Sequence, residues 1–127
     1  MSITGRAKLA GVMGWPVGHS LSPTLHGYWL QTLGIDGAYV PLAVRPENFV
    51  DALRMLPKLG FAGVNITIPH KETALVVLDE VDEVARRIGA VNTVVVRPDV
   101  TLKGSNTDAF GFVENMKWRH PSWDATA

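Results

Sequence analysis

The chain has 127 residues, 46% of them hydrophobic, and its twelve Lys and Arg balance its twelve Asp and Glu. This composition is typical of one globular domain and excludes a disordered chain. A net charge of zero provides no basic surface for a phosphate backbone, so we expect no nucleic-acid partner. Because the chain has no cysteine, it has neither disulfides nor thiolate metal sites.

Strand and helix patterns alternate along the first part of the chain. Residues 8–14 are almost continuously apolar, which predicts a buried strand rather than a signal peptide or membrane span. We therefore expect a cytoplasmic protein without a membrane partner. Ser22–Pro23 predicts a helix with a serine N-cap, and Gly34 predicts its end. Residues 38–44 predict a second strand at the edge of a sheet, because Pro41 has no N–H to donate.

The same alternation continues to the end of the chain. Residues 46–60 predict a second helix, with Phe49, Leu53 and Leu56 on its apolar face. Residues 63–68 alternate as in a third strand, and Pro69 predicts the first turn of the next helix. Two helices, separated by an acidic segment, are predicted at 71–78 and 81–88. Two strands joined by a turn are predicted at 89–96 and 101–104, and a last helix is predicted after an N-cap cluster at 106–108. The pattern predicts an α/β fold, a single-domain three-layer sandwich with a mostly parallel sheet flanked by helices.

Polar side chains gather at the ends of the predicted strands, where open α/β sheets bind ligands. Ser20 and Ser22 lie beside a helix N-terminus, where free N–H groups and the helix dipole favour an anion. Simple capping by Ser22 is the other interpretation. Asn65 and Thr67 can hydrogen-bond ligand hydroxyls as donors and acceptors. Lys71 offers a cation or a proton, unless it is an ordinary solvated lysine of a helix.

Two further polar residues follow the later strands. Asn92 lies in an apolar segment, where a buried amide needs hydrogen-bond partners. Asp108 either caps the last helix or faces a ligand. A lysine and an aspartate together can donate a proton to an oxygen that becomes an alkoxide, and recover it later. Spacing alone does not establish that Lys71 and Asp108 meet.

Motifs for cofactors and metals are absent from the sequence. It has no G-x-G-x-x-G and no G-x-x-x-x-G-K-[ST] to hold phosphates, and its four histidines show no metal-ligand spacing with carboxylates. We therefore predict no metal and no cofactor-binding residues in this chain. His19 and His70 could line a cleft, but a loop or surface position is favoured for both.

The polar residues belong to four longer segments, Gly14–Pro23, Gly63–Lys71, Gly89–Thr93 and Gly104–Asp108. In this order, the segments closely resemble the substrate-binding domain of the shikimate dehydrogenases, and the resemblance extends from about residue 10 to residue 112. It implies an enzyme that reversibly reduces 3-dehydroshikimate to shikimate with NADPH, in the route through chorismate to the aromatic amino acids. Gly27 departs from the family, which often has Asn there, at a position that is not among the substrate contacts.

The resemblance implies three roles for seven residues. The substrate carboxylate would be bound by Ser20 and Ser22. The ring hydroxyls would be bound by Asn65, Thr67 and Asn92. The catalytic pair, which also contacts the substrate, would be Lys71 and Asp108.

The largest departure from the family is where the chain stops. Family members continue into a Rossmann-type domain that holds NADP(H), and return with a helix that bears a substrate-contacting glutamine. We expect residues 1–117 to form the substrate-binding domain and residues 118–127 to lead toward an absent cofactor domain. The chain alone should hold no NADP(H) and show no appreciable dehydrogenase activity, because hydride transfer needs the nicotinamide held over the substrate. Apolar surface around Val113, Met116 and Trp118 could drive self-association or a homodimer.

Alternatives remain open at this point. One is a quinate/shikimate dehydrogenase that uses NAD or NADP, because the residues that choose the cofactor are absent here. Another is a non-catalytic module that binds a hydroxylated cyclic carboxylate in the same cleft. A purely structural domain would not bind shikimate at all.

Overall fold

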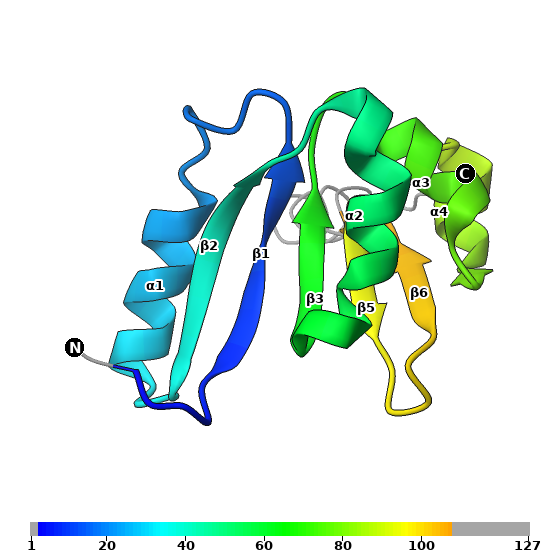
Figure 1. Ribbon diagram of the computed structural model, residues 1–127. Coiled ribbons are helices and arrows are strands. Elements are labelled where there is room, and N and C mark those ends of the chain that lie inside the picture. The colour runs from blue at the N-terminus through cyan, green and yellow to red at the C-terminus, as the bar shows by residue number, and fades with distance from the viewer. Residues whose placement is uncertain (1–2, 108–127) are drawn as a thin grey trace, which may run out of the picture.

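The computed structural model describes residues 3–107. Its helices and strands are, in chain order, β1 (Lys8–Gly14), α1 (Ser22–Thr32), β2 (Gly37–Ala43), α2 (Phe49–Met55), β3 (Phe61–Ile66), α3 (Lys71–Val77), β4 (Glu80–Val81), α4 (Glu83–Ile88), β5 (Thr93–Val96) and β6 (Leu102–Ser105). Short 3-10 turns at Pro46–Asn48 and Pro57–Leu59 flank α2. Figure 1 shows this alternation of strands and helices.

The six strands form one mixed sheet in the order β2-β1-β3-β5-β6-β4. β1 runs parallel to both β2 and β3, and β4 runs parallel to β6. β5 is antiparallel to β3 and to β6, with which it forms the hairpin expected from the sequence. Most of the strand pairings are therefore parallel, as predicted. β2 lies at the edge of the sheet, so its Pro41 occupies the position predicted for it.

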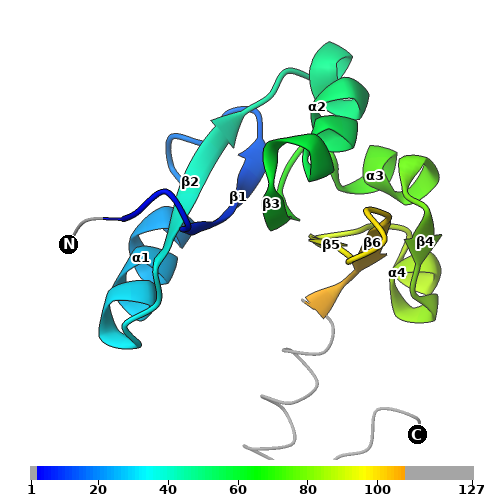
Figure 2. The ribbon, with the colours of Figure 1, turned by 60° about the horizontal axis from the view of Figure 1, so that its bottom comes forward.

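Helices lie on both faces of the sheet, which confirms the three-layer sandwich (Figure 2). α2, α3 and α4 cover one face and enclose the core with β1, β3 and β5. The predicted apolar face of the second helix is buried there, since Phe49, Leu53 and Leu56 are each at most 1% exposed. The opposite face carries α1, which contributes no fully buried residue. No helix among residues 3–107 is long and apolar enough to cross a membrane.

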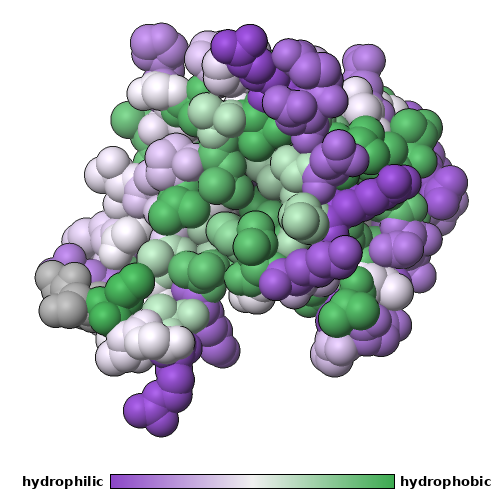
Figure 3. All heavy atoms as spheres, viewed as in Figure 1, coloured by the Kyte–Doolittle hydropathy of each residue, from purple (hydrophilic) through white to green (hydrophobic). Residues whose placement is uncertain are grey.

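Hydrophobic side chains also reach the surface on the face that carries α2. Figure 3 shows them across the middle of that face, with hydrophilic side chains around them at the top and right. Met55 at the end of α2 and Leu59 in the following turn are 47% and 61% exposed. The sheet and its helices thus leave apolar surface outside the core.

The segment around Pro69 differs from the prediction. β3 begins at Phe61, two residues earlier than expected, and ends at Ile66. The Ile68–Pro69 peptide bond is cis, and the chain turns here with a hydrogen bond from the His70 N–H to the Thr67 carbonyl, 3.0 Å. The helix therefore starts only at Lys71. The prediction that Pro69 occupies the first helical turn was wrong.

Two other boundaries were also wrong. The acidic segment contains the short strand β4, which pairs in parallel with β6. Glu80 of this strand also forms ion pairs with Arg97 and Lys103, both at 3.3 Å. β5 begins at Thr93 rather than at Gly89. Gly89 instead ends α4 in a left-handed conformation (φ 82°), which glycine adopts without the steric cost of a Cβ.

Candidate functional site

The candidate site begins where β1 and β3 end side by side. The Thr67 N–H donates to the Met13 carbonyl (2.9 Å), and the Trp15 N–H donates to the Ile68 carbonyl (3.1 Å). Gly14 allows this approach, because a Cβ there would lie 2.3 Å from Thr67 Cγ2. The loops after the two parallel strands are therefore held together at the carboxyl edge of the sheet, where α/β proteins bind ligands.

The two serines lie at the start of α1, but Ser22 is not its N-cap. Leu21 occupies that position and makes no side-chain cap, and Ser22 is the first helical residue. The Ser22 N–H donates to Ser20 Oγ at 3.2 Å. Ser20 therefore accepts the N–H of the first helical residue, and the prediction that Ser22 is the N-cap was wrong. Both side chains are half-buried at the helix N-terminus, where a bound anion is electrostatically favoured.

Asn65, near the end of β3, is fixed from two sides. The Tyr39 hydroxyl donates to Asn65 Oδ1 at 2.7 Å. The Asn65 Nδ2 group donates to Thr93 Oγ1 at 3.3 Å, with a longer contact of 3.5 Å to the Asn92 carbonyl. The two Nδ2 hydrogens thus have partners within the protein, and one lone pair of Oδ1 remains to accept from a ligand hydroxyl.

Asn92 is 7% exposed, and its side-chain oxygen accepts several hydrogen bonds. The donors are Thr93 Oγ1 at 2.9 Å, the Thr107 N–H at 2.9 Å and Thr107 Oγ1 at 3.2 Å. These contacts supply the partners that a buried amide needs. They also saturate the oxygen, so the group that Asn92 can offer a ligand is its NH₂ donor.

Lys71 is half-buried and is the first residue of α3. Its carbonyl accepts a hydrogen bond from the Val91 N–H at 2.9 Å, which ties the start of the helix to the segment that carries Asn92. Asp108 lies outside the described residues, as do Val113, Met116 and Trp118. The pairing of Lys71 with Asp108 therefore stays a prediction.

His70, beside Lys71, is buried rather than in the loop or surface position favoured from the sequence. Its side chain is 1% exposed and its ring stacks on Phe49 with the centroids 4.3 Å apart. Nε2 donates to the Val44 carbonyl at 2.6 Å. The ring thus belongs to the core and joins α2 to the turn before α3. His19 is exposed in its loop, as expected.

Sequence reasoning missed two neighbours of the site, Tyr39 on β2 and His26 on α1. Their rings stack, with centroids 4.0 Å apart and planes at 18°. Burial raises the pKa of the Tyr39 hydroxyl, and a hydrogen bond with the Ser22 side chain partly opposes this rise. No motif marks Tyr39, and its stacking on His26 arises only from the packing of α1 against β2.

Burial lowers the pKa of His26 below 6.5, and we expect this to appear as acid sensitivity. Its Nδ1 is buried without a hydrogen-bond partner in the described part of the chain, so the neutral ring is favoured in the folded state. The unfolded state takes up a proton first as the pH falls through about 6.5, so stability should fall from there down to the folded-state pKa, by at most about 1.4 kcal/mol per pH unit. Urea unfolding at several pH values between 8 and 5 measures this slope. In His26→Phe the slope should be shallower, and an unchanged slope would contradict the assignment.

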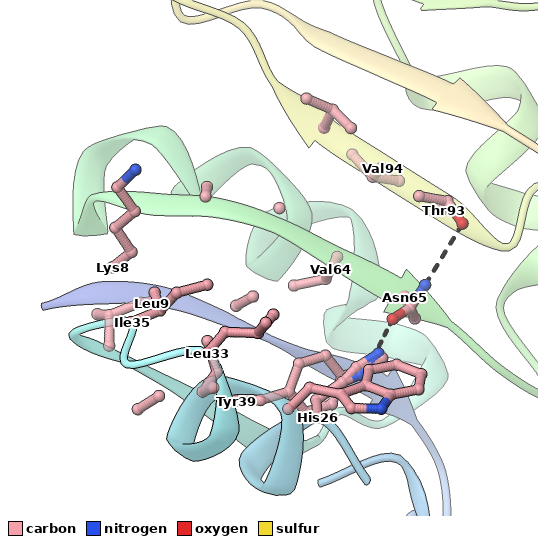
Figure 4. A pocket seen from close by; sticks show the side chains of 17 residues that line it. Lys8, Leu9, His26, Leu33, Ile35, Tyr39, Val64, Asn65, Thr93 and Val94 are labelled. Atoms are coloured by element: carbon pink, nitrogen blue, oxygen red, sulfur yellow. Dashed lines mark hydrogen bonds between the residues drawn. The ribbon is translucent and has the colours of Figure 1, made fainter.

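A largely apolar groove of about 430 Å³ runs between α1 and the open face of β1, β3 and β5. Lys8, Leu9 and Ile35 lie toward one end in Figure 4, and Asn65 and Thr93, which are joined by a hydrogen bond, lie at the other. The lining does not include the two serines, Thr67 or Lys71. The groove therefore adjoins the polar site through Tyr39 and Asn65 rather than containing it.

The turn at the end of β1 does not have the form of a dinucleotide site. Such a site needs a glycine-rich turn that leaves room for a pyrophosphate. At the end of β1, the space beside Gly14 is filled by Thr67 and Val17, whose side-chain carbons lie 2.3 and 2.9 Å from an added Cβ. Across residues 3–107 there is also no group of three His, Asp or Glu side chains placed to hold a metal ion.

Comparison with known proteins identifies the family. Residues 12–94 match the family model described as the shikimate dehydrogenase substrate binding domain. The chain belongs to this family. It is 63% identical over 123 residues to the shikimate dehydrogenase (NADP(+)) of Rhodospirillum rubrum, covering 97% of this chain and 44% of that protein. It is 58% identical over 125 residues to that of Paramagnetospirillum magneticum, covering 98% and 45%. The chain thus spans less than half the length of these relatives.

Solved structures show the same fold. The shikimate dehydrogenase of Aquifex aeolicus superposes with a TM-score of 0.87 at 36% identity, covering 94% of this chain and 45% of that one. The Thermus thermophilus enzyme, in complex with NADP(H) and shikimate, gives 0.81 at 44% identity, covering 87% and 41%. A 5-ketofructose reductase from a Gluconobacter strain gives 0.85 at 32% identity, covering 90% and 41%. The fold is therefore shared with a reductase named for a different substrate.

Proposed function

We propose that this chain binds shikimate and 3-dehydroshikimate, as the substrate-binding domain of an NADP-dependent shikimate dehydrogenase. The observation that carries the proposal is the pair of oriented amides, Asn65 and Asn92, at the carboxyl edge of the sheet. A ring with neighbouring hydroxyl groups needs fixed donors and acceptors of this kind. The family match and the names of the relatives support the same substrate.

Each site residue then has a role set by its chemistry. Ser20 and Ser22 bind the substrate carboxylate at the N-terminus of α1, where anions are favoured. The ring hydroxyls are bound by Asn65, Thr67 and Asn92. Lys71 and Asp108 form the acid–base pair, in which the Lys71 ammonium protonates the ketone oxygen as it becomes an alkoxide.

We also propose that, in the complete protein, substrate and cofactor are bound by different domains. Residues 1–117 form the substrate-binding domain, and residues 118–127 lead toward the part that holds NADP(H). When bound, NADPH supplies the hydride for ketone reduction. We assign substrate binding, orientation and proton transfer to this chain. A cytoplasmic location, the chorismate pathway and a homodimer stay predictions.

A titration of the 127-residue chain with shikimate tests substrate binding directly. We expect binding that weakens about tenfold in Ser22→Ala, because a hydrogen bond to a charged group contributes roughly 1.5–3 kcal/mol and is partly replaced by water here. The neutral methyl ester of shikimate should bind weakly and should not distinguish Ser22→Ala from the unsubstituted chain. Isothermal titration calorimetry measures both ligands.

Thr24→Ala is the matched control, since Thr24 is an exposed hydroxyl residue of the same helix. It should leave shikimate binding unchanged. No shikimate binding at millimolar concentration would refute the proposal and favour a purely structural domain. Equal weakening of acid and ester by Ser22→Ala would contradict the carboxylate role.

A second candidate is a related reductase with a different substrate, which the resemblance to the 5-ketofructose reductase supports. A quinate/shikimate dehydrogenase that uses NAD or NADP is another reductase of this kind. Titration of the same sample with quinate and 5-ketofructose decides between them. Shikimate should bind at least about tenfold more tightly than either if the serine and amide contacts recognise it, a difference of roughly 1.4 kcal/mol.

A further inference from the structure

Tyr39 lies between the two halves of the candidate site without belonging to either. It comes from the edge strand β2, whereas Asn65 comes from β3, with β1 between them. Its side chain is half-buried, its hydroxyl donates to Asn65 Oδ1, and its ring stacks on His26 of α1, the helix that begins at Ser22. Figure 4 shows Tyr39 and Asn65 directed toward each other, with His26 beside the tyrosine ring. Tyr39 thus connects the proposed carboxylate and hydroxyl subsites.

The donor and acceptor roles of the groups around Asn65 determine which way its amide is oriented. Thr93 uses its hydroxyl hydrogen on Asn92 Oδ1, so toward Asn65 it can only accept. Asn65 must therefore turn Nδ2 to Thr93 and Oδ1 to the Tyr39 hydroxyl, which is the arrangement found. Of these two contacts, the one to Tyr39 is the shorter, 2.7 Å against 3.3 Å. Removing it would leave the amide held only by the longer contacts of Nδ2, 3.3 Å to Thr93 Oγ1 and 3.5 Å to the Asn92 carbonyl.

The aromatic packing in turn fixes Tyr39. The His26 ring stacks on the tyrosine ring at 4.0 Å and meets Trp29 edge-on at 5.2 Å. The tyrosine ring therefore rests against α1, the helix whose first residue is Ser22. The hydroxyl reaches Asn65 from a supported position, which is what a residue that orients another side chain requires.

We propose that Tyr39 is a positioning residue, which orients the Asn65 amide for the substrate hydroxyl by donating a hydrogen bond to Oδ1. It acts through Asn65 and need not contact the substrate. This inference rests on the proposed function for its effect on shikimate, but the orientation of Asn65 can be tested without any ligand.

Tyr39→Phe removes only the hydroxyl and keeps the ring against His26. We expect this variant to bind shikimate about five- to tenfold more weakly, the range set by one hydrogen bond of roughly 1 to 1.4 kcal/mol. If Tyr39 acts through Asn65, the double variant Tyr39→Phe with Asn65→Ala should bind within about twofold of Asn65→Ala alone, because residues that act as a unit are not additive. Calorimetric titration of the full 127-residue chain measures all four proteins. Additive losses would overturn the proposal and indicate direct contact between Tyr39 and the substrate.

The ligand-free readout is the pair of NMR signals from each asparagine side-chain NH₂ group. In Tyr39→Phe, the Asn65 signals should shift and broaden, while those of Asn92 should keep their positions. Tyr28→Phe is the matched control, since Tyr28 is the chain's other tyrosine, on α1 and 64% exposed. Tyr28→Phe should change neither the NH₂ signals of Asn65 and Asn92 nor the affinity for shikimate. Unchanged Asn65 signals in Tyr39→Phe would overturn the proposal even if shikimate binds. If the unsubstituted chain does not bind shikimate, the proposed function fails while these signals still decide the role of Tyr39.

Discussion

Replacing Lys71 with methionine is expected to lower kcat for shikimate oxidation by about 10³-fold, within the range found for general acid–base residues. Methionine keeps much of the length and the apolar stem of lysine but cannot carry a proton. Lys71 is half-buried at the start of α3, and its carbonyl holds the segment that carries Asn92, a backbone contact that the substitution retains. Shikimate affinity should therefore change by less than about tenfold, because the serines and amides still bind the ligand.

Turnover has to be measured with a cofactor domain present. A fusion of this chain to the remaining part of the Rhodospirillum rubrum relative provides one, since the two proteins are 63% identical over the 123 residues that the chain would replace. Lys58→Met is the control, because Lys58 is an exposed lysine in the turn after α2. It should leave kcat and affinity unchanged. If Lys71→Met reduced binding and turnover equally, the site would be a binding site rather than a catalytic one.

The sequence predicted the elements of this fold well where apolar periodicity was strong. The helix with Phe49, Leu53 and Leu56 lies with that face in the core, and the edge position of β2 followed from Pro41 alone. The strand β4 was missed because two residues show no periodicity. It is a strand because its backbone pairs with β6, a contact between distant parts of the chain.

The candidate site was only partly predictable for a similar reason. Motifs identified Ser20, Asn65 and Asn92, and the structure shows the amides joined through Thr93. The substrate roles of these residues remain predictions. Tyr39 could not be found, because it reaches Asn65 across β1 from a strand without a motif. The prediction that Ser22 is the N-cap of α1 was wrong. Ser22 is the first helical residue, and its N–H donates to Ser20 Oγ.

Gly14→Ala should destabilise the chain and weaken shikimate binding together. The added Cβ would lie 2.3 Å from Thr67 Cγ2, 2.9 Å from Val17 Cγ1 and 3.1 Å from the Ile68 carbonyl oxygen. Overpacking of this kind costs about 1–3 kcal/mol, and urea unfolding measures it. Gly18→Ala is the control within the same loop, because a Cβ at Gly18 meets no atom within 4 Å. Its stability should stay within about 0.5 kcal/mol of the unsubstituted chain.

The loss of affinity follows from the structure of threonine. The methyl and hydroxyl groups of Thr67 are attached to the same Cβ. A rotation about χ1 that relieves the clash between the Thr67 methyl and the new alanine Cβ therefore also moves the hydroxyl. If χ1 does not rotate, the clash can be relieved only by a shift of the turn that precedes Lys71. Such a shift would disturb the hydrogen bond from the Thr67 N–H to the Met13 carbonyl on β1. Either movement displaces a group that contacts the substrate in the proposed site. We therefore expect Gly14→Ala to bind shikimate at least about tenfold more weakly at a temperature where it is fully folded. A folded Gly14→Ala protein with unchanged affinity would show that the position of Thr67 does not matter for shikimate.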